Sequence, residues 1–185
     1  MEKELLADAK HRMDKAVEAV KTEFTTVRSG RASTGLLDRI HVDYYGTSTP
    51  LNQMANVAAP EPRLVTVQPY DKTAMKSIEK AIMESDLGVN PSNDGTVIRL
   101  PIPALTEERR KELVKQVHHR AEEGRVAVRN VRRHAKDEME KLEHDGAISE
   151  DDLARAEKDL QKLTDRFVAE IDQIQGHKEQ ELMEV

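Results

Sequence analysis

Apolar side chains recur every three or four positions in three long segments of the chain, the spacing that places them on one face of an α-helix. The segments span residues 2–29, residues 106–144 and the residues that follow Ser149. A helix that carries one apolar face must bury it against a partner. The apolar positions are, segment by segment, Leu6, Ala9, Met13, Ala16, Val20, Phe24 and Val27; Leu113, Val117, Gly124, Val128, Val131, Ala135 and Leu142; and Leu153, Ala156, Leu160, Leu163, Phe167, Ile171 and Ile174.

Start and stop signals bound these three helices. Gly30 follows the first as a stop, because glycine adopts the left-handed conformation that ends helices. Thr106 and Ser149 are suitable N-cap residues, and the acidic residues after each favour the positive end of a helix dipole. The break at Asp145-Gly146 leaves so short a link that the second and third helices must run antiparallel. The three apolar faces therefore predict an elongated antiparallel three-helix bundle.

The residues between the first two helices show shorter and mixed patterns. Alternating or β-branched residues bounded by turn signals predict strands there, and a helical spacing closed by a glycine predicts one short helix. The expected strands lie at 40–44, 64–67 and 96–100, and the expected helix lies at 73–87.

These patterns divide the chain into two domains. The bundle consists of residues 1–30 and 106–185, and a small β/α/β domain of residues 31–105 is inserted between its first two helices. We therefore predict an α+β protein. Because the first helix must end near the start of the second, both connections leave from one end of the bundle. We expect a hinge there, at about residues 29–32 and 103–106.

Composition narrows the classes of function. With 37% hydrophobic and 35% charged residues, the 185-residue chain fits long exposed helices better than one thick core. Two Phe, three Tyr and no Trp leave little for stacking on bases, which argues against a single-strand binder with an aromatic platform. The absence of Cys excludes disulfides and thiolate metal sites and is compatible with a reducing cytoplasm. No signal peptide or membrane-spanning run is evident, so we expect a soluble, cytoplasmic protein.

A second face of the 106–144 helix is basic. Between residues 109 and 133 there are nine Lys or Arg and three Glu, a local charge of +6 in a chain of net charge -6. Like charges three or four residues apart repel, and an anionic partner would explain them. Guanidinium groups favour phosphate, to which they donate two parallel hydrogen bonds; the alternative is a solvated face with local ion pairs. The arginine stripe comprises Arg125, Arg129, Arg132, Arg133 and Lys136.

Other candidate chemistry has less support. His118 and His119 are adjacent and point in different directions on a helix, so they do not form a metal-binding pair. Residues 90–95 resemble the start of a calcium loop, but Pro101 stands where that loop needs a glutamate, which favours a simple turn. We expect no metal, cofactor, membrane or small-molecule substrate and no enzymatic activity. Two alternatives remain: a coiled-coil-like adaptor or chaperone that binds proteins, and an enzyme with its site in the inserted domain.

Three short motifs carry a further signal. They are Val27-Arg28-Ser29-Gly30-Arg31-Ala32, Leu105-Thr106-Glu107-Glu108-Arg109-Arg110-Lys111 and Ala127-Val128-Arg129-Asn130-Val131-Arg132-Arg133. Together with Asp86-Leu87-Gly88, the Asn90-Pro91 turn before Ile98-Arg99, and Lys178-Glu179 near the end, they resemble the signatures of the ribosome recycling factor family. The resemblance covers the whole chain.

The resemblance implies an L-shaped, tRNA-like protein in which a hinge joins the bundle to the β/α/β domain. It implies a non-catalytic translation factor that binds the post-termination ribosome along large-subunit ribosomal RNA. With the GTPase elongation factor G and GTP, such factors promote subunit dissociation, so that mRNA and tRNA are released and ribosomes are reused. We expect a monomer.

The resemblance also implies roles for particular residues. Arg132 matches the family's main RNA-contacting arginine, and it belongs to the arginine stripe. The expected RNA-binding residues are Arg132, Arg129, Arg133 and Arg28, together with Arg125 and Lys136 of the stripe. The expected hinge residues are Gly30, Arg31, Pro103, Ala104 and Leu105.

Overall fold

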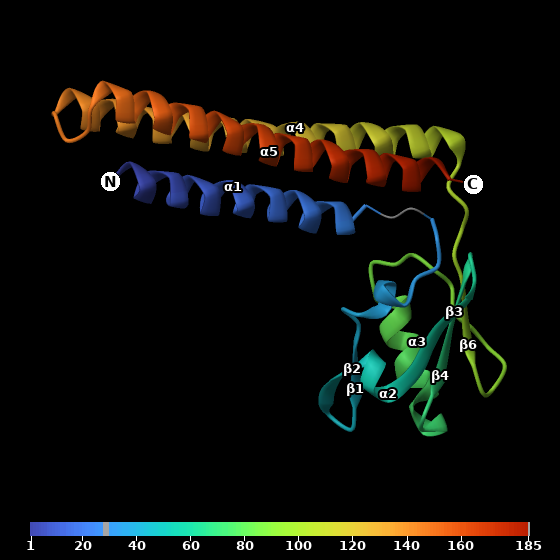
Figure 1. Cartoon of the computed structure of the whole chain (residues 1–185). Helices are drawn as coiled ribbons and strands as arrows, with labels where there is room; N and C mark the ends of the chain where they lie inside the picture. Colours follow the sequence, from blue (N-terminus) through green and yellow to red (C-terminus); the bar gives the residue numbers. More distant parts are fainter. Residues whose placement is uncertain (28–29, 185) are drawn as a thin grey trace. The chain divides into compact units, whose positions relative to one another are not determined.

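The computed structural model describes residues 1–27 and 30–184, and it divides the chain into two compact units (Figure 1). One unit, which we call the helical unit, consists of Met1–Arg28 and Glu107–Val185. The other, which we call the insert, consists of Ser29–Thr106. The chain thus leaves the helical unit after one helix and returns to it for two more, and the fold is α+β.

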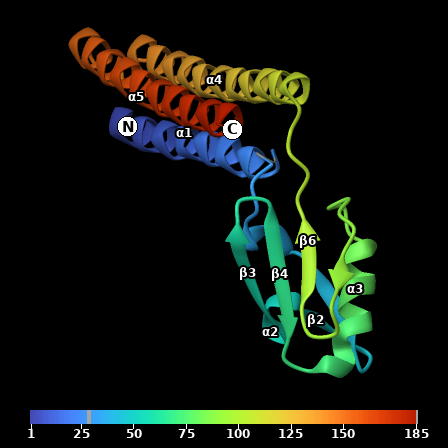
Figure 2. The ribbon, with the colours of Figure 1, turned by 90° about the vertical axis from the view of Figure 1, so that its right-hand side faces the viewer.

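Three long helices make up the helical unit: α1 (Glu2–Thr25), α4 (Glu107–His144) and α5 (Glu150–Met183). Each helix contacts the other two. In Figures 1 and 2 they lie side by side, with α4 antiparallel to both α1 and α5. At 1.5 Å per residue, the 38 residues of α4 extend for about 57 Å. The predicted antiparallel three-helix bundle is confirmed.

The apolar faces of the helices are buried, with small shifts from the predicted positions. In α1, Val17 is buried and Ala16 is half-buried; in α4, Met139 is buried and Leu142 is half-buried. A repeat of seven does not match 3.6 residues per turn, so the buried face drifts along a straight helix. The other predicted positions that are only half-buried are Leu6, Leu153, Leu163 and Ile174.

Of two predicted helix boundaries, the stop at Gly30 is wrong and the N-cap at Ser149 is confirmed. The first helix ends at Thr25, with Thr26 as its cap, so Gly30 is not the residue that stops it. The hydroxyls of both threonines donate to carbonyls three residues earlier, bonds that compete with continuation of the helix. At the start of α5, Ser149 Oγ accepts from Asp152 N (3.0 Å) and Asp152 Oδ2 accepts from Ser149 N (3.3 Å). This capping box confirms Ser149 as the N-cap.

The insert is built on a four-stranded antiparallel sheet with the strand order β3-β4-β6-β5. A separate hairpin, β1 and β2, and the helix α3 share one hydrophobic core with this sheet; Figure 1 labels all three. The strands are β1 (His41–Tyr44), β2 (Thr47–Pro50), β3 (Ala55–Glu61), β4 (Leu64–Pro69), β5 (Ser92–Asn93) and β6 (Ile98–Pro101). The helices are α2 (Leu51–Met54), α3 (Met75–Met83) and two 3-10 turns, η1 (Thr34–Leu37) and η2 (Lys72–Ala74).

The insert is richer in strands than the β/α/β pattern predicted. The three predicted strands correspond to β1, β4 and β6, whereas β2, β3 and β5 were not predicted. Pro60 within β3 obscured that strand, because proline occurs mainly in edge strands, and β3 is an edge of the sheet. The predicted helix is shorter, since α3 ends at Met83. The hydrophobic core of the insert comprises Leu37, Ile40, Val42, Leu51, Met54, Ala55, Val65, Val67, Ala74, Met75, Ile78, Ile82, Val89, Ile98 and Leu100.

Candidate nucleic-acid interface

Four of the five residues of the arginine stripe present their charged groups at the surface of α4. Arg129, Arg133 and Lys136 are exposed, and Arg132 is half-buried. Arg132 and Arg133 are adjacent, and each lies three or four residues from Arg129 and from Lys136, which places all four along one side of the helix. Arg28, the remaining predicted RNA-binding residue, lies outside the residues that the structure describes.

Arg132 lies beside a hollow between α4 and α5. Its Nη1 donates to Gln161 Oε1 (3.2 Å), and Gln161 Nε2 donates to Asp165 Oδ1 (2.8 Å). The hollow, of about 160 Å³, is lined by Arg129, Arg132, Gln161, Thr164, Asp165 and Val168. A guanidinium has five N–H donors, so the bond to Gln161 leaves Arg132 with donors for an oxygen-rich ligand.

The exposed stripe residues have weak local partners. Arg129 Nη1 lies 3.6 Å from Glu122 Oε1, and Lys136 Nζ lies 3.7 Å from Glu140 Oε1. Arg133 Nη2 donates to its neighbour Asn130 at 3.4 Å. Exposed pairs of this kind contribute at most about 1 kcal/mol, so a phosphate can replace them at small cost. Local acidic partners are therefore present, as the solvated-face alternative requires, but they do not block the face.

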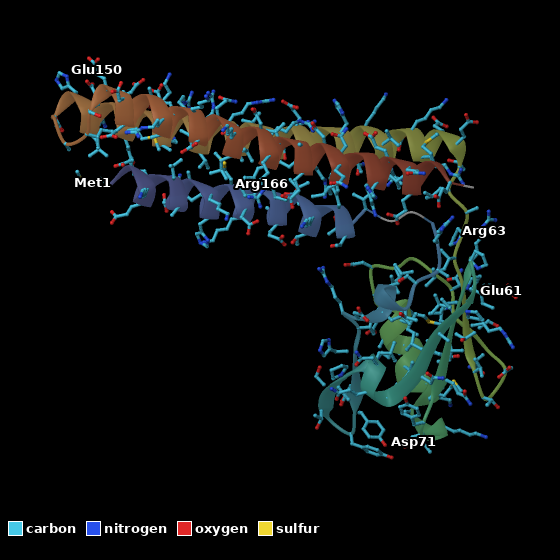
Figure 3. The ribbon with its side chains drawn as sticks, viewed as in Figure 1. Met1, Glu61, Arg63, Asp71, Glu150 and Arg166 are labelled. Carbon is cyan, nitrogen blue, oxygen red and sulfur yellow. The ribbon has the colours of Figure 1, made fainter. Side chains whose placement is uncertain are left out.

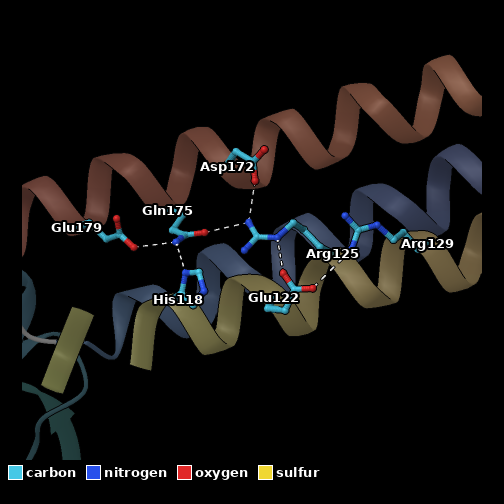
Figure 4. A network of polar contacts seen from close by, with 7 residues as sticks. All are labelled: His118, Glu122, Arg125, Arg129, Asp172, Gln175 and Glu179. Atoms are coloured by element: carbon cyan, nitrogen blue, oxygen red, sulfur yellow. Dashed lines mark hydrogen bonds and ion pairs between the residues drawn. The ribbon is translucent and has the colours of Figure 1, made fainter. Parts of the chain in front are cut away.

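Arg125 departs from the prediction, because it is buried and not part of the exposed face. Its side chain is 9% exposed. Nε donates to Glu122 Oε2 (2.9 Å), and Nη1 donates to Asp172 Oδ1 (2.7 Å) and Gln175 Oε1 (2.9 Å), as Figure 4 shows. Position 125 follows the buried Ala121 by four residues, so the same helical period that buries the apolar face also turns this arginine inward.

The network around Arg125 includes residues that the sequence did not single out. Gln175 Nε2 donates to Glu179 Oε1 (2.7 Å) and lies 2.9 Å from His118 Nδ1. The hydrogen bond from Arg125 lowers the pKa of Glu122, and the charges of Arg125 and Arg129 act in the same direction. Glu122 is thus a carboxylate at neutral pH. Its spacing of three residues from Arg125 is that of the local ion pairs in the solvated-face alternative; the α5 partners gave no sequence signal.

Another basic residue of α4 also serves the fold. Arg120 Nη1 donates to the carbonyl of Glu23 (3.2 Å) and to Thr26 Oγ1 (3.1 Å), where α1 ends. The carboxyl end of a helix carries a partial negative charge, so a cation there is favourable. Charge counting along the sequence therefore overstates the positive charge that faces solvent.

The predicted hinge residues that the structure describes lie on the two connections of the insert. Pro103 and Ala104 are exposed, as is Arg31, and Leu105 is half-buried. Gly30 has a φ of +76°, and a Cβ there would lie 2.8 Å from Leu105 Cγ.

Both connections are fastened to one turn of the insert. Ala32 N donates to Pro62 O (2.7 Å), and Ile102 N donates to Arg63 O (2.8 Å). Pro62 and Arg63 are consecutive residues between β3 and β4, where Figure 3 labels Arg63. The connections are therefore held to the insert at residues 32 and 102.

The other predicted sites are structural. Asp94 Oδ1 accepts from Thr96 N and Val97 N, each at 2.9 Å, so the calcium-like segment is a turn closed by its own side chain. Within residues 1–27 and 30–184, no three His, Asp or Glu side chains form a group that could hold a metal ion. Among the same residues, no helix combines the length and the apolar character that crossing a bilayer requires.

The fold and the basic face together define an α+β protein with a helical unit, an inserted sheet unit and exposed arginines on one long helix. The sequence model of the ribosome recycling factor family matches residues 20–183. The chain belongs to the ribosome recycling factor family, a family of translation factors. The resemblance drawn from the sequence motifs is confirmed.

Relatives and solved structures agree over the full length. The ribosome-recycling factor of Shouchella clausii is 59% identical and that of Bacillus pumilus 57% identical, each over 100% of both chains. A solution structure of the ribosome recycling factor superposes with a TM-score of 0.80 at 46% identity, covering 100% of this chain and 98% of that one. A T. thermophilus ribosome recycling factor, in models with E. coli elongation factor G bound to the E. coli post-termination complex, has a TM-score of 0.64 at 49% identity and covers 100% of both chains.

Proposed function

We propose that this protein binds the post-termination ribosome on large-subunit ribosomal RNA. With elongation factor G and GTP, it then promotes subunit dissociation and the release of mRNA and tRNA. It acts in the cytoplasm as a monomeric, non-catalytic factor that uses no cofactor and no small-molecule substrate. Its family membership and the ribosome complex of a related factor support this proposal.

The exposed arginines of α4 carry the proposal. Arg129, Arg132 and Arg133 place three guanidinium groups on one side of a long helix, and the first two of them line the hollow of about 160 Å³. Folded RNA presents phosphates at regular spacing, and a rigid helix can meet several of them at once. The face therefore suits the backbone of structured RNA, and it offers no aromatic platform for stacked bases.

The two connections provide the hinge of the proposed action. Residues 29–32 and 103–106 allow the insert to move relative to the helical unit when elongation factor G acts on it. Gly30 supports this role, because its positive φ and its contact with Leu105 both depend on the absence of a side chain. Hydrolysis of GTP belongs to elongation factor G, and this protein transmits the resulting motion.

Substitution of Arg132 tests the RNA contact. We expect Arg132→Ala to weaken binding to large ribosomal subunits about tenfold, since a charge-assisted bond to phosphate is lost. The slope of log affinity against log salt should fall by about 0.7 to 0.9 for each lost contact. Binding is measured by co-sedimentation at two salt concentrations, and subunit splitting with elongation factor G and GTP is measured alongside.

Arg12→Ala is the matched control for this experiment. The side chain of Arg12 on α1 is 49% exposed, it lies outside the arginine stripe, and among the described residues it has an ion pair with Asp8. We expect this variant to bind and split ribosomes normally. Equal losses of ribosome binding in both variants would mean that net charge alone, and not the position of Arg132, causes the effect. If the unmodified protein neither binds nor splits ribosomes, a protein-binding adaptor replaces the proposed function.

A further inference from the structure

Glu122 stands between one buried and one exposed arginine. Its Oε2 accepts from Arg125 Nε at 2.9 Å, whereas its Oε1 lies 3.6 Å from Arg129 Nη1. The first distance is that of a charge-assisted hydrogen bond, and the second is too long for one. The carboxylate is therefore held by the buried arginine and only attracted by the exposed one. Figure 4 shows Glu122 between these two arginines.

Arg125 cannot turn outward without loss of several bonds. Its guanidinium only donates, so the oxygen of the Gln175 amide must face it, and the amide nitrogen must face Glu179 and His118. Asp172 takes a further bond at 2.7 Å. Because these α5 partners fix the guanidinium from the far side, its Nε remains directed at Glu122. Removing a buried charged partner would leave the others unpaired.

We propose that Arg125 is a positioning residue for the RNA-binding face, which holds the Glu122 carboxylate so that the Arg129 guanidinium stays available to phosphate. Arg125 itself does not contact RNA. This inference rests on the function proposed above and assigns Arg125 a role other than the direct contact expected from its place in the stripe. Without Arg125, both oxygens of Glu122 would be free to close on Arg129 as a paired bond that competes with phosphate.

A thermodynamic cycle between two substitutions tests the proposal. Arg125→Met keeps an unbranched stem about as long as the part of arginine up to Nε, and it removes the guanidinium donors. In the otherwise unmodified protein, we expect this change to weaken binding to large ribosomal subunits about fivefold, which is the size of effect that coupled neighbours show. In a protein that already carries Arg129→Ala, the same change should alter the affinity less than about twofold. Moderate salt screens the longer-range effect of the lost charge.

Removal of the competing carboxylate should reverse the effect. The double variant with Arg125→Met and Glu122→Gln has the same net charge as the unmodified protein, and we expect its affinity to return to within about twofold of normal. A role of Arg125 in the fold alone would not predict this rescue. An undiminished loss in the Arg129→Ala background, or a double variant as weak as Arg125→Met, would overturn the proposal.

Asp172→Asn is the structural control. It removes the charge of one α5 partner of Arg125, while the bonds of Arg125 to Gln175 on α5 and to Glu122 keep its Nε directed at the carboxylate. We expect a lower melting temperature with unchanged affinity, and an equal loss of affinity would show that the network acts through stability. The Arg132→Ala measurement separates the two proposals. If that variant loses binding while the Arg125 cycle is additive, only the positioning role fails.

Discussion

In the helical unit the buried side chains form a narrow line along each helix, whereas in the insert they surround one sheet and one short helix. The line in α4 includes Leu113, Val117 and Val128, all set by spacings of three and four residues. In the insert, Val67 of β4 pairs with Ile98 of β6, which is distant in the sequence. The comparison shows that one core follows from local periodicity and the other from long-range pairing.

The polar anchors of the two units differ in the same way. In the helical unit, Arg125 and Arg120 bond to groups on other helices. In the insert, Asp71, Asp94 and Ser33 accept hydrogen bonds from the backbone two or three residues further along the chain. Bonds between helices fix how surface arginines are presented, and bonds within turns fix where strands and helices begin.

Removal of a buried side chain from the insert should have the largest effect. Ile78 of α3 is 0% exposed, and Ile78→Ala should lower the free energy of unfolding by about 3 kcal/mol. All three Tyr lie in the insert, so their fluorescence reports its unfolding in urea, while circular dichroism at 222 nm reports mainly the long helices. Only the fluorescence midpoint should shift strongly. Met83→Ala, at an exposed position of the same helix, is the control.

A side chain at Gly124 should have the corresponding effect on the helical unit. A Cβ there would overlap Val20 Cγ2 and lie 3.4 Å from Ile171 Cδ1, so α1 and α5 both approach α4 at this residue. We expect Gly124→Leu to cost about 2 to 3 kcal/mol through overpacking, seen at 222 nm and not in the Tyr signal. Gly176→Leu on α5, where a Cβ meets nothing within 4 Å, should leave the midpoint unchanged or raise it.

An alanine at the connection should have a smaller effect, confined to the insert. At Gly30 the positive φ costs an L-residue about 1 to 2 kcal/mol, and the close approach of Leu105 adds to it. Gly88 has a φ of +65° with nothing within 4 Å of a Cβ, so Gly88→Ala measures the free-energy cost of the positive φ alone. Gly30→Ala should lower the Tyr midpoint more than Gly88→Ala. Equal shifts would mean that the Leu105 contact has no consequence.

The smallest expected effect is on the stability of the insert at acidic pH. Hydrogen bonds from Thr73, and then from the Tyr44 hydroxyl, lower the pKa of Asp71. The folded carboxyl thus has a lower pKa than the unfolded one, so it contributes stability above the unfolded value of about 3.9, and this is lost as the pH falls through the folded value. Asp71→Asn should lower the Tyr midpoint at pH 7 and have less effect in acid.

The sequence predicted most of the helical unit because its determinants are local. Neighbours within a few residues determine the apolar positions of the helices, the Ser149 cap and the antiparallel direction of α5. The shift from Ala16 to Val17 and the inward turn of Arg125 were missed, since both depend on how far the buried face extends around the helix. Packing against the other helices sets that width.

Less of the insert could be predicted. The strand β3 combines Asn56, Pro60 and apolar residues without alternation, and its pairing with β4 shifts register between Ala58 and Glu61. The two-residue strand β5 carries no pattern at all, and only its pairing with β6 defines it. The exposed arginines were predicted by residue type, but their relation to Glu122 required the α5 partners that hold Arg125.

The turn between β3 and β4 also makes the insert a separable module. Because Ala32 and Ile102 bond to consecutive residues, the insert begins and ends at neighbouring points of its own surface. A domain with adjacent ends can be cut out and expressed alone, or replaced by a short loop that restores a continuous three-helix protein. The insert of one relative can thus be joined to the helical unit of another through the same two short connections.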